Sequence, residues 1–321
     1  KSVKNNNEKN FRKFYKYILQ RIKLLGFNRI IVQVRPFGDA LYESQYFPWA
    51  ACISGKQGKN PGYDPLKIMT EMSHQENIAI EAWINPYRIS SGDSIQSLSK
   101  TNPAKIWFSS QNTKRNVLSY NGSLYYNPSS ESVRNLIIKG VEEIVQNYDV
   151  DGIHMDYIRY PEQGQRFPDS QNFKKYGKSK NLADWRRENI NRMVANLYDW
   201  IKQVKPWVQV SSAPLGKYSK IERVPNAGWT AYESVYQDPK NWMQQGKQDM
   251  IVPMMYYLYD HFFPFVDNWV ENCQGRLVVP GLGAYRMDKS EANWTVNDIT
   301  DQIDYSRYYG GAGCAFFRCA H

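Results

Sequence analysis

The chain has 321 residues, of which 42% are hydrophobic, so it can bury a large core and disorder is excluded over most of its length. Its 41 Lys and Arg outnumber 31 Asp and Glu, but the basic residues are scattered and no RNA- or DNA-binding motif accompanies them, which argues against a nucleic-acid partner. No apolar run approaches the roughly 18 residues of a membrane span.

The spacing of histidines and cysteines argues against metal chemistry. The four histidines form no HxxH or HxxxH pair and the four cysteines form no CxxC pair, so we expect no metal site and no cofactor. A single disulfide stays possible. Aromatic residues make up 15% of the chain, which suits a cleft that stacks on sugar rings, although large cores also use them.

Helical and strand patterns alternate along the chain. Apolar residues recur at spacings of three and four from about Asn7 to Leu25, which predicts a helix, and Arg29 to Val34 follows as a strand. The same order continues with helix–strand pairs at 65–75 and 78–84, 130–147 and 150–161, 182–204 and 208–212, near 241 and 250–255, near 265 and 277–279, and 296–309 and 313–317.

This alternation predicts an α/β fold with a parallel sheet, most simply a single (β/α)8 TIM-type barrel domain over residues 1–321. Seven strands are visible, so we expect the first barrel strand to lie upstream of Lys1 or in a segment read wrongly. An open doubly wound sheet is the alternative, but no Gly-x-Gly-x-x-Gly turn follows a strand. Long segments follow the strands, at 36–64, 86–128, 157–181 and 213–235, and in barrels such segments build the site.

Strand alternation places polar side chains on one face of successive strands. These side chains are Gln33 and Arg35, then Glu81, Trp83 and Asn85, then His154 and Asp156. We expect Glu81 and Gln33 to fill deeper barrel layers as a satisfied network. We expect Arg35, Asn85 and Asp156 to face the mouth, where barrel enzymes carry their chemistry.

Asp156, at the end of V-D-G-I-H-M-D, is the best candidate for a catalytic carboxylate. Glycoside cleavage needs two carboxyl groups, one that protonates the leaving oxygen and one that acts as nucleophile or activates water. Asp238 and Glu162 are the leading candidates for the partner and Asp39 is third, although a surface or turn role is as plausible for each. Asp151 lies at the entry end of its strand, where a structural role is expected.

Several motifs run through nearly the whole chain in a familiar order. They include L-G-F-N-R-I-I-V-Q-V-R-P-F-G-D-A-L-Y at 25–42, E-A-W-I-N-P-Y-R at 81–88, V-D-G-I-H-M-D-Y at 150–157, D-M-I-V-P-M-M-Y-Y at 249–257 and G-L-G-A-Y-R at 281–286. On these motifs the chain resembles the glycosyl-hydrolase-like family 10 barrels. The family pattern begins with a further strand, which agrees with the strand expected upstream.

The resemblance implies a (β/α)8 barrel of bacterial secreted or cell-envelope proteins that hydrolyses cell-wall or other polysaccharide glycans. The matched polar positions, together with His154, supply the expected substrate-binding residues: Arg35, Asn85, Tyr87, Arg88, His154, Tyr256, Tyr285 and Arg318. Asp156 and Asp238 match as well. This chain departs from many relatives in carrying Tyr157 where a second acid is common and Met254 where an amide is common.

We therefore expect a glycoside hydrolase whose partner is a polysaccharide or peptidoglycan glycan. The competing interpretation is a barrel that binds glycans without cutting them, because the second carboxylate is not assigned. A scaffold or adhesion domain is a third interpretation. Nothing in the sequence indicates a particular oligomeric state.

Overall fold

The computed structural model describes residues 7–161, 166–177 and 179–319. Two compact units make up the chain. The first contains residues 1–157, 167–176 and 200–209, and the second contains 158–166, 177–199 and 210–321. The sequence-based expectation of a single domain stays a prediction.

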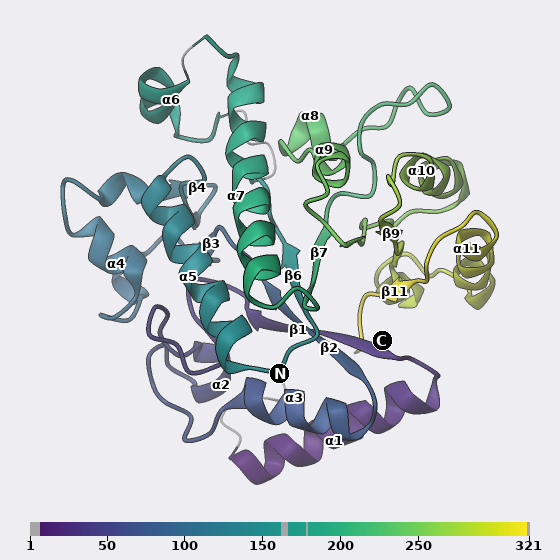
Figure 1. The fold of residues 1–321 in the computed structure, drawn as a ribbon, viewed down its shortest axis with the longest axis horizontal. Coiled ribbons are helices and arrows are strands. Elements are labelled where there is room, and N and C mark those ends of the chain that lie inside the picture. The colour runs from purple at the N-terminus through teal and green to yellow at the C-terminus, as the bar shows by residue number, and fades with distance from the viewer. Residues whose placement is uncertain (1–6, 162–165, 178, 320–321) are drawn as a thin grey trace. The chain divides into compact units, whose positions relative to one another are not determined.

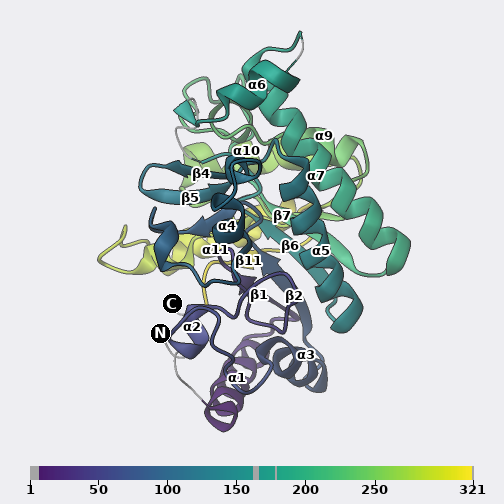
Figure 2. The ribbon, with the colours of Figure 1, turned by 90° about the vertical axis from the view of Figure 1, so that its left-hand side faces the viewer.

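The first unit is built on three parallel strands that pair in the order β1, β2, β6. The strands are β1 (Arg29–Arg35), β2 (Ala79–Ile84) and β6 (Gly152–Asp156), and the helices that precede them are α1 (Glu8–Leu24), α3 (Pro65–Gln75) and α5 (Glu131–Asn147) (Figure 1). Both views of the ribbon show α1 and α3 side by side (Figures 1 and 2). These are the helix–strand pairs that the alternation of patterns predicts.

Each of these helices begins where a side chain can replace a missing backbone partner. The side chains of Asn7, Asp64 and Ser130 accept hydrogen bonds from backbone N–H groups in the first turns of α1, α3 and α5. Pro65 follows Asp64 at the first helical position, where its lack of an N–H group does no harm. Local sequence therefore determines these three starts.

Strand β6 is buried along its whole length. Gly152 is required at its start, because a Cβ atom there would lie 2.8 Å from Cγ of Glu81. The Glu81 side chain occupies that space, and Arg29 of β1 forms an ion pair with it. Glu81 thus belongs to a polar network in the lower part of this sheet, with Arg29 and Gln209.

The long segment after β2 folds into structure that the sequence analysis did not predict. Strands β3 (Arg88–Ser90), β4 (Val117–Tyr120) and β5 (Ser123–Tyr126) form an antiparallel sheet in the order β3-β5-β4. The same segment contains the short helix α4 (Pro103–Phe108), which lies beside β4 (Figure 2). Two further short helices occur elsewhere: α2 (Ala51–Ser54) after β1 and α6 (Ser170–Tyr176) after β6. The signal was available, because Asn121-Gly122 joins β4 to β5 with positive φ at both residues, as a tight hairpin turn requires.

The second unit continues the alternation of helix and strand. Its elements are α7 (Leu182–Val204), β7 (Gln209–Ala213), α8 (Ala231–Ser234), α9 (Pro239–Gln244), β8 (Met250–Ile251), α10 (Tyr259–Glu271), β9 (Leu277–Val278), β10 (Gly281–Leu282), α11 (Val296–Tyr308) and β11 (Ala315–Phe316). Strands β7, β8 and β9 pair in parallel, as do β10 and β11. All seven strands predicted from the sequence therefore occur within the described residues.

Several of these strands are shorter than predicted: β6 covers 152–156 of the predicted 150–161, β11 covers 315–316 of the predicted 313–317, and β8 is cut short as well. The sequence indicates a strand over 250–255, whereas β8 ends at Ile251. Pro253 has no N–H group to give to a neighbouring strand, which interrupts the ladder. Met254 resumes the pairing as isolated bridges to Leu215 and Gly281.

Within the described residues, no helix combines the length and the apolar character needed to cross a membrane. The four cysteines are unpaired, so the disulfide that the sequence left open is not formed.

Candidate active site

Asp156 ends strand β6, at the edge of the first unit where its parallel strands finish. Its side chain is 6% exposed, and the backbone N–H of Tyr157 donates a hydrogen bond of 2.6 Å to its Oδ1. Tyr157 adopts a left-handed backbone with φ of 51°, which is uncommon for residues other than glycine. The turn after β6 thus orients the Asp156 carboxylate through the main chain.

The polar face that alternation predicts is present in the middle of the sheet. Gln33 lies opposite Trp83, and Trp83 lies opposite His154, so these three side chains belong to one face. The rings of Trp83 and His154 meet edge to face with centroids 6.2 Å apart. Trp83 is half-buried.

His154 is a neutral side chain in the interior. Burial lowers the pKa of His154 to about 4, and the carboxylate of Glu81, whose Oε2 lies 3.9 Å from Nδ1, offsets only part of that effect. The Glu81 carboxylate is itself paired with Arg29, whose Nη1 also donates to the Gln209 side chain at 2.6 Å. At neutral pH His154 therefore offers one donor and one acceptor without charge.

Arg35 does not share the face of Gln33, which corrects the sequence-based expectation. The pairing of β1 with β2 shifts between Gln33 and Arg35, so Arg35 lies opposite Ile84. A shift of one residue sends a side chain to the opposite face of a sheet. Arg35 is 1% exposed and its guanidinium lies 4.5 Å from the centre of the Phe47 ring, so it does not line the mouth.

Gly140 of α5 shows how closely the Arg35 side chain is packed in this layer. A Cβ atom at Gly140 would lie 2.9 Å from Nη1 of Arg35 and 2.5 Å from the Phe47 ring. Burial lowers the pKa of Arg35, whereas the nearby acidic side chains of Glu143 and Asp39 raise it. The helix-facing position of Arg35 makes it part of the support for the segment after β1.

Asn85 and Tyr87 support the end of β2. The Asn85 side chain accepts a hydrogen bond from Nε1 of Trp83 at 2.7 Å and donates one to the carbonyl oxygen of Pro36 at 2.9 Å. Tyr87 is 1% exposed, and burial raises the pKa of its hydroxyl. Asn85 therefore ties β2 to the segment after β1. Tyr87, which comes after Asn85 in the chain, is buried, and its role in binding substrate stays a prediction.

Arg88 packs near two aromatic rings at the rim. Its guanidinium carbon is 5.0 Å from the centre of the Phe37 ring and 4.7 Å from the centre of the Tyr157 ring, and all three residues are half-buried. Arg88 is among the residues predicted from the sequence, whereas Phe37 and Tyr157 are not. Their positions directly after predicted strands were the available signal.

The predicted residues of the second unit divide between a helix cap and an aromatic cluster. Asp238 is the N-cap of α9, where its Oδ1 accepts a hydrogen bond from the Tyr218 hydroxyl at 2.9 Å and a longer one from the backbone of Asn241. Burial is the main cause of the raised pKa of Tyr218, and the charge of Asp238 adds to it. Asp238 therefore has a structural role whether or not it takes part in catalysis.

Tyr256 and Tyr285 lie together, with Phe317 as a third ring. The Tyr256 ring stacks on Phe317 at 5.7 Å and meets the edge of Tyr285 at 5.7 Å. The guanidinium of Arg318 lies 5.7 Å from the centre of the Phe317 ring, and Arg318 is exposed.

Glu162, the other candidate for a catalytic carboxylate, lies outside the described residues.

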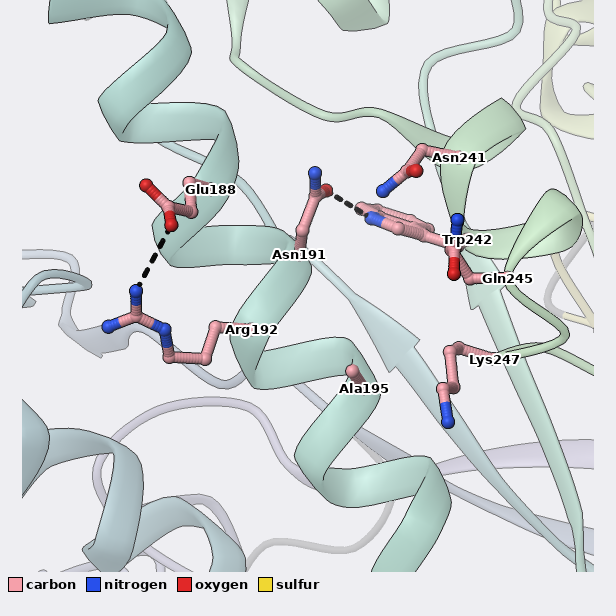
Figure 3. Close-up of a pocket in the computed structure, with 8 residues that line it drawn as sticks. All are labelled: Glu188, Asn191, Arg192, Ala195, Asn241, Trp242, Gln245 and Lys247. Carbon is pink, nitrogen blue, oxygen red and sulfur yellow. Dashed lines mark hydrogen bonds and ion pairs between the residues drawn. The ribbon is translucent and has the colours of Figure 1, made fainter. Parts of the chain in front are cut away.

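The second unit also holds a pocket of about 290 Å³ between α7 and α9 (Figure 3). No predicted site residue lines it, and its polar groups largely satisfy one another. The Trp242 indole donates to Oδ1 of Asn191 at 2.6 Å, and Arg192 pairs with Glu188 at 3.3 Å (Figure 3). The described residues contain no cluster of three or more His, Cys, Asp or Glu side chains that could hold a metal ion.

The repeat of helix and parallel strand, with polar groups where strands end, defines a TIM-type α/β barrel of the kind used by glycoside hydrolases. The PgaB (BpsB) glycoside hydrolase domain from Bordetella bronchiseptica superimposes with a TM-score of 0.69 at 10% identity, covering 99% of this chain and 91% of that one. An endo-1,4-beta-mannanase from Rhizomucor miehei gives a TM-score of 0.62 at 10% identity, over 96% and 82%. These similarities confirm the predicted barrel fold.

The family follows from the sequence. Residues 3–271 match the family described as Glycosyl hydrolase-like 10, and the chain belongs to that family. Glycosyl hydrolase YngK of Bacillus subtilis is 36% identical over 296 residues, covering 86% of this chain and 56% of its own length. Glycosyl hydrolase DigH of Escherichia coli K12 is 32% identical, covering 89% of this chain and 70% of its own length. The chain thus spans little more than half of YngK.

Proposed function

We propose that this chain hydrolyses glycosidic bonds in a bacterial cell-wall glycan or a related polysaccharide, with Asp156 as one of two catalytic carboxyl groups. The position of Asp156 supports the proposal above all. It ends a buried parallel strand and accepts a main-chain hydrogen bond that orients it. In barrel enzymes this end of the strands carries the reaction. Membership of the family, and the names of YngK and DigH, point to the same chemistry.

Glycoside hydrolysis assigns complementary tasks to two carboxyl groups. One protonates the oxygen of the leaving sugar, and the other attacks the anomeric carbon or deprotonates the attacking water. Asp156 suits either task. Asp238 and Glu162 are the candidates for the second carboxyl group, and the cap that Asp238 provides to α9 does not use its Oδ2 in any hydrogen bond found among the described residues.

Substrate contacts are proposed for both units. On the first unit, Arg88 presents N–H groups that suit sugar hydroxyls or an acidic substituent. On the second unit, Tyr256 and Tyr285 offer aromatic surface against which a sugar ring can stack, and exposed Arg318 offers further donors.

The test compares product formation by the wild-type protein and by Asp156→Asn, using mass spectrometry after incubation with peptidoglycan glycan strands and a panel of plant and host polysaccharides. We expect cleavage by the wild type and a loss of at least about a hundredfold in the variant, since removing a catalytic acid or base costs about that much or more. Asp149→Asn is the matched control, because the Asp149 side chain is 84% exposed and lies before the same strand.

Equal cleavage by wild type and Asp156→Asn would contradict the assignment of Asp156. Binding of a polysaccharide by the wild type without turnover on any member of the panel would instead support a barrel that binds glycans without cutting them.

We also propose that the protein acts outside the cytoplasm, in the cell envelope or secreted, because its proposed substrate lies there. Fractionation of the producing bacterium followed by immunoblotting should find the protein in the envelope or medium fraction. Recovery with cytoplasmic marker enzymes alone would contradict this location.

A further inference from the structure

Three arginines in the described part of the chain, Arg88, Arg186 and Arg286, each lie near two aromatic rings. Arg186 and Arg88 lie nearer to their rings than Arg286 does, and these two differ in exposure. In the second unit, the guanidinium of Arg186 lies 5.1 Å from the Tyr160 ring centre and 5.0 Å from that of Tyr236. Arg186 is 1% exposed and donates to the Tyr236 hydroxyl at 3.2 Å. This arrangement belongs to the interior, where a stacked cation contributes to packing.

Arg88 lies at similar distances from its two rings, but its surroundings are more exposed than those of Arg186. Phe37, Arg88 and Tyr157 are all half-buried, and they lie just beyond the ends of β1, β2 and β6. A half-exposed arginine could lie free in water and keep its rotamer entropy. Its packing near two rings therefore needs a reason other than filling the core.

The backbone holds both rings in place. On one side, the Pro36 carbonyl oxygen accepts from the Asn85 side chain at 2.9 Å, and the N–H of Gly38 donates to the carbonyl oxygen of Ile89 at 3.1 Å. Phe37 lies between these two anchored residues and next to Arg88 in space. Its ring is thus carried by a main chain that is tied on both sides.

We call Phe37, Arg88 and Tyr157 together the clamp. On the other side, Tyr157 connects this clamp to Asp156, the candidate catalytic group. Its backbone N–H donates to Asp156, and its φ of 51° is a conformation that a tyrosine adopts at a cost of about 1 kcal/mol. Glycine would adopt this turn freely and would give up the ring. A tyrosine at this position keeps an aromatic face against Arg88.

We propose that Phe37 and Tyr157 are positioning residues that hold the Arg88 guanidinium as a fixed hydrogen-bonding fork for the sugar bound next to Asp156. The inference rests on the proposed function. Rings packed against a guanidinium restrict the motion of its side chain, while its N–H donors lie in its plane and suit hydroxyl or carboxylate oxygens. Because the fork is ordered before substrate arrives, less side-chain entropy is lost on binding.

The experiment measures kcat and KM on peptidoglycan glycan strands, or on whichever panel polysaccharide the wild type cleaves. Phe37→Leu and Tyr157→Leu remove one ring each, and leucine, like phenylalanine and tyrosine, is not branched at Cβ. We expect each to raise KM about tenfold and to change kcat by less than about twofold, which corresponds to loss of binding that substrate and transition state share. Phe37→Tyr and Tyr157→Phe keep the rings and should restore wild-type KM.

A double-mutant cycle separates positioning from general stabilisation. Arg88→Lys keeps the charge but loses the planar fork, so it should raise KM by a similar factor. Adding Phe37→Leu to Arg88→Lys should then raise KM little further, because the ring acts through the arginine. Tyr17→Leu is the control, since it removes a ring that lies 5.8 Å from Arg21 on the exposed surface of α1.

Independent, additive effects of Phe37→Leu and Arg88→Lys, or an unchanged KM in both leucine variants while the wild type cleaves, would overturn the inference and leave the proposed function intact. If the wild type neither cleaves nor binds any glycan, the proposed function fails and the role of the clamp fails with it. The NMR shift of the Arg88 Nε–H group in ¹⁵N-arginine-labelled protein reports on the clamp separately. It should move when Phe37 becomes leucine, because the ring current is lost.

Discussion

Asp39 is a carboxyl group held in an unfavourable environment. It is buried after β1, and its Oδ2 accepts a hydrogen bond of 3.0 Å from the Gln57 side chain. Burial raises the pKa of Asp39 to about 6, and the positive charge of Arg35 offsets only part of this effect. The sequence analysis ranked Asp39 third among the candidates for the second carboxylate, and its seclusion favours a role in holding the loop.

A raised pKa in the folded state predicts how stability depends on pH. The folded protein binds the Asp39 proton more tightly than the unfolded chain, so this contribution to stability is complete below about pH 4 and is lost as pH rises through about 6. Asp39→Asn resembles the protonated acid and should be about as stable as wild type at pH 4. Above pH 7 it should be more stable, by up to about 3 kcal/mol.

Urea denaturation of both proteins between pH 4 and pH 8 checks this prediction, and parallel curves of unfolding free energy against pH would contradict it.

The Asp39→Asn variant lacks the pH-dependent contribution of Asp39 to stability, so it reveals the opposite contribution of His154. Because burial lowers the pKa of His154 to about 4, its contribution is present above about pH 6.5 and is lost as pH falls toward 4. The Asp39→Asn protein should therefore lose stability more steeply in acid than the wild type does.

At the scale of elements, the sequence predicted the repeating order because each strand and helix carries its own pattern. The first helix has strong periodicity and clear ends, and its bounds agree with the prediction to within one residue. The strand with Asp156 is present, but it ends at Asp156, before the predicted end at Pro161. Arg35 was misplaced because a shift in pairing depends on two strands together, and β1 alone shows alternation that continues through Arg35. A local pattern cannot reveal a bulge that exists only in the pairing.

The cap of α9 supports a prediction that separates stability from catalysis at Asp238. Asp238→Ala removes the side-chain cap and should lower stability by about 1 kcal/mol, whereas Asp238→Asn keeps a good capping residue and should lower it much less. Thermal denaturation of the two variants measures this difference. If Asp238→Asn keeps its midpoint and loses glycan cleavage, the residue is the second carboxylate. Retained cleavage would remove it from the candidates, and equal midpoints for the two variants would contradict the role as a cap.

For the whole molecule, the barrel and the family could be predicted from sequence, and the second carboxylate could not. The barrel repeats one unit many times, so single errors matter little. A pair of catalytic carboxyl groups is instead defined by a distance between residues that come from different strands. In sequence, Asp238, Glu162 and Asp39 differ from the other acidic residues of the chain only by lying after predicted strands.

The left-handed turn at Tyr157 also limits how this protein can change over evolutionary time. Beta-branched residues are excluded there by their own backbone, whatever they would do to a substrate. Asparagine, aspartate and glycine tolerate the turn best. Sequence drift at the position beside Asp156 should therefore move between tyrosine and these small residues, and a selection library at codon 157 should be depleted of valine, isoleucine and threonine before activity is considered.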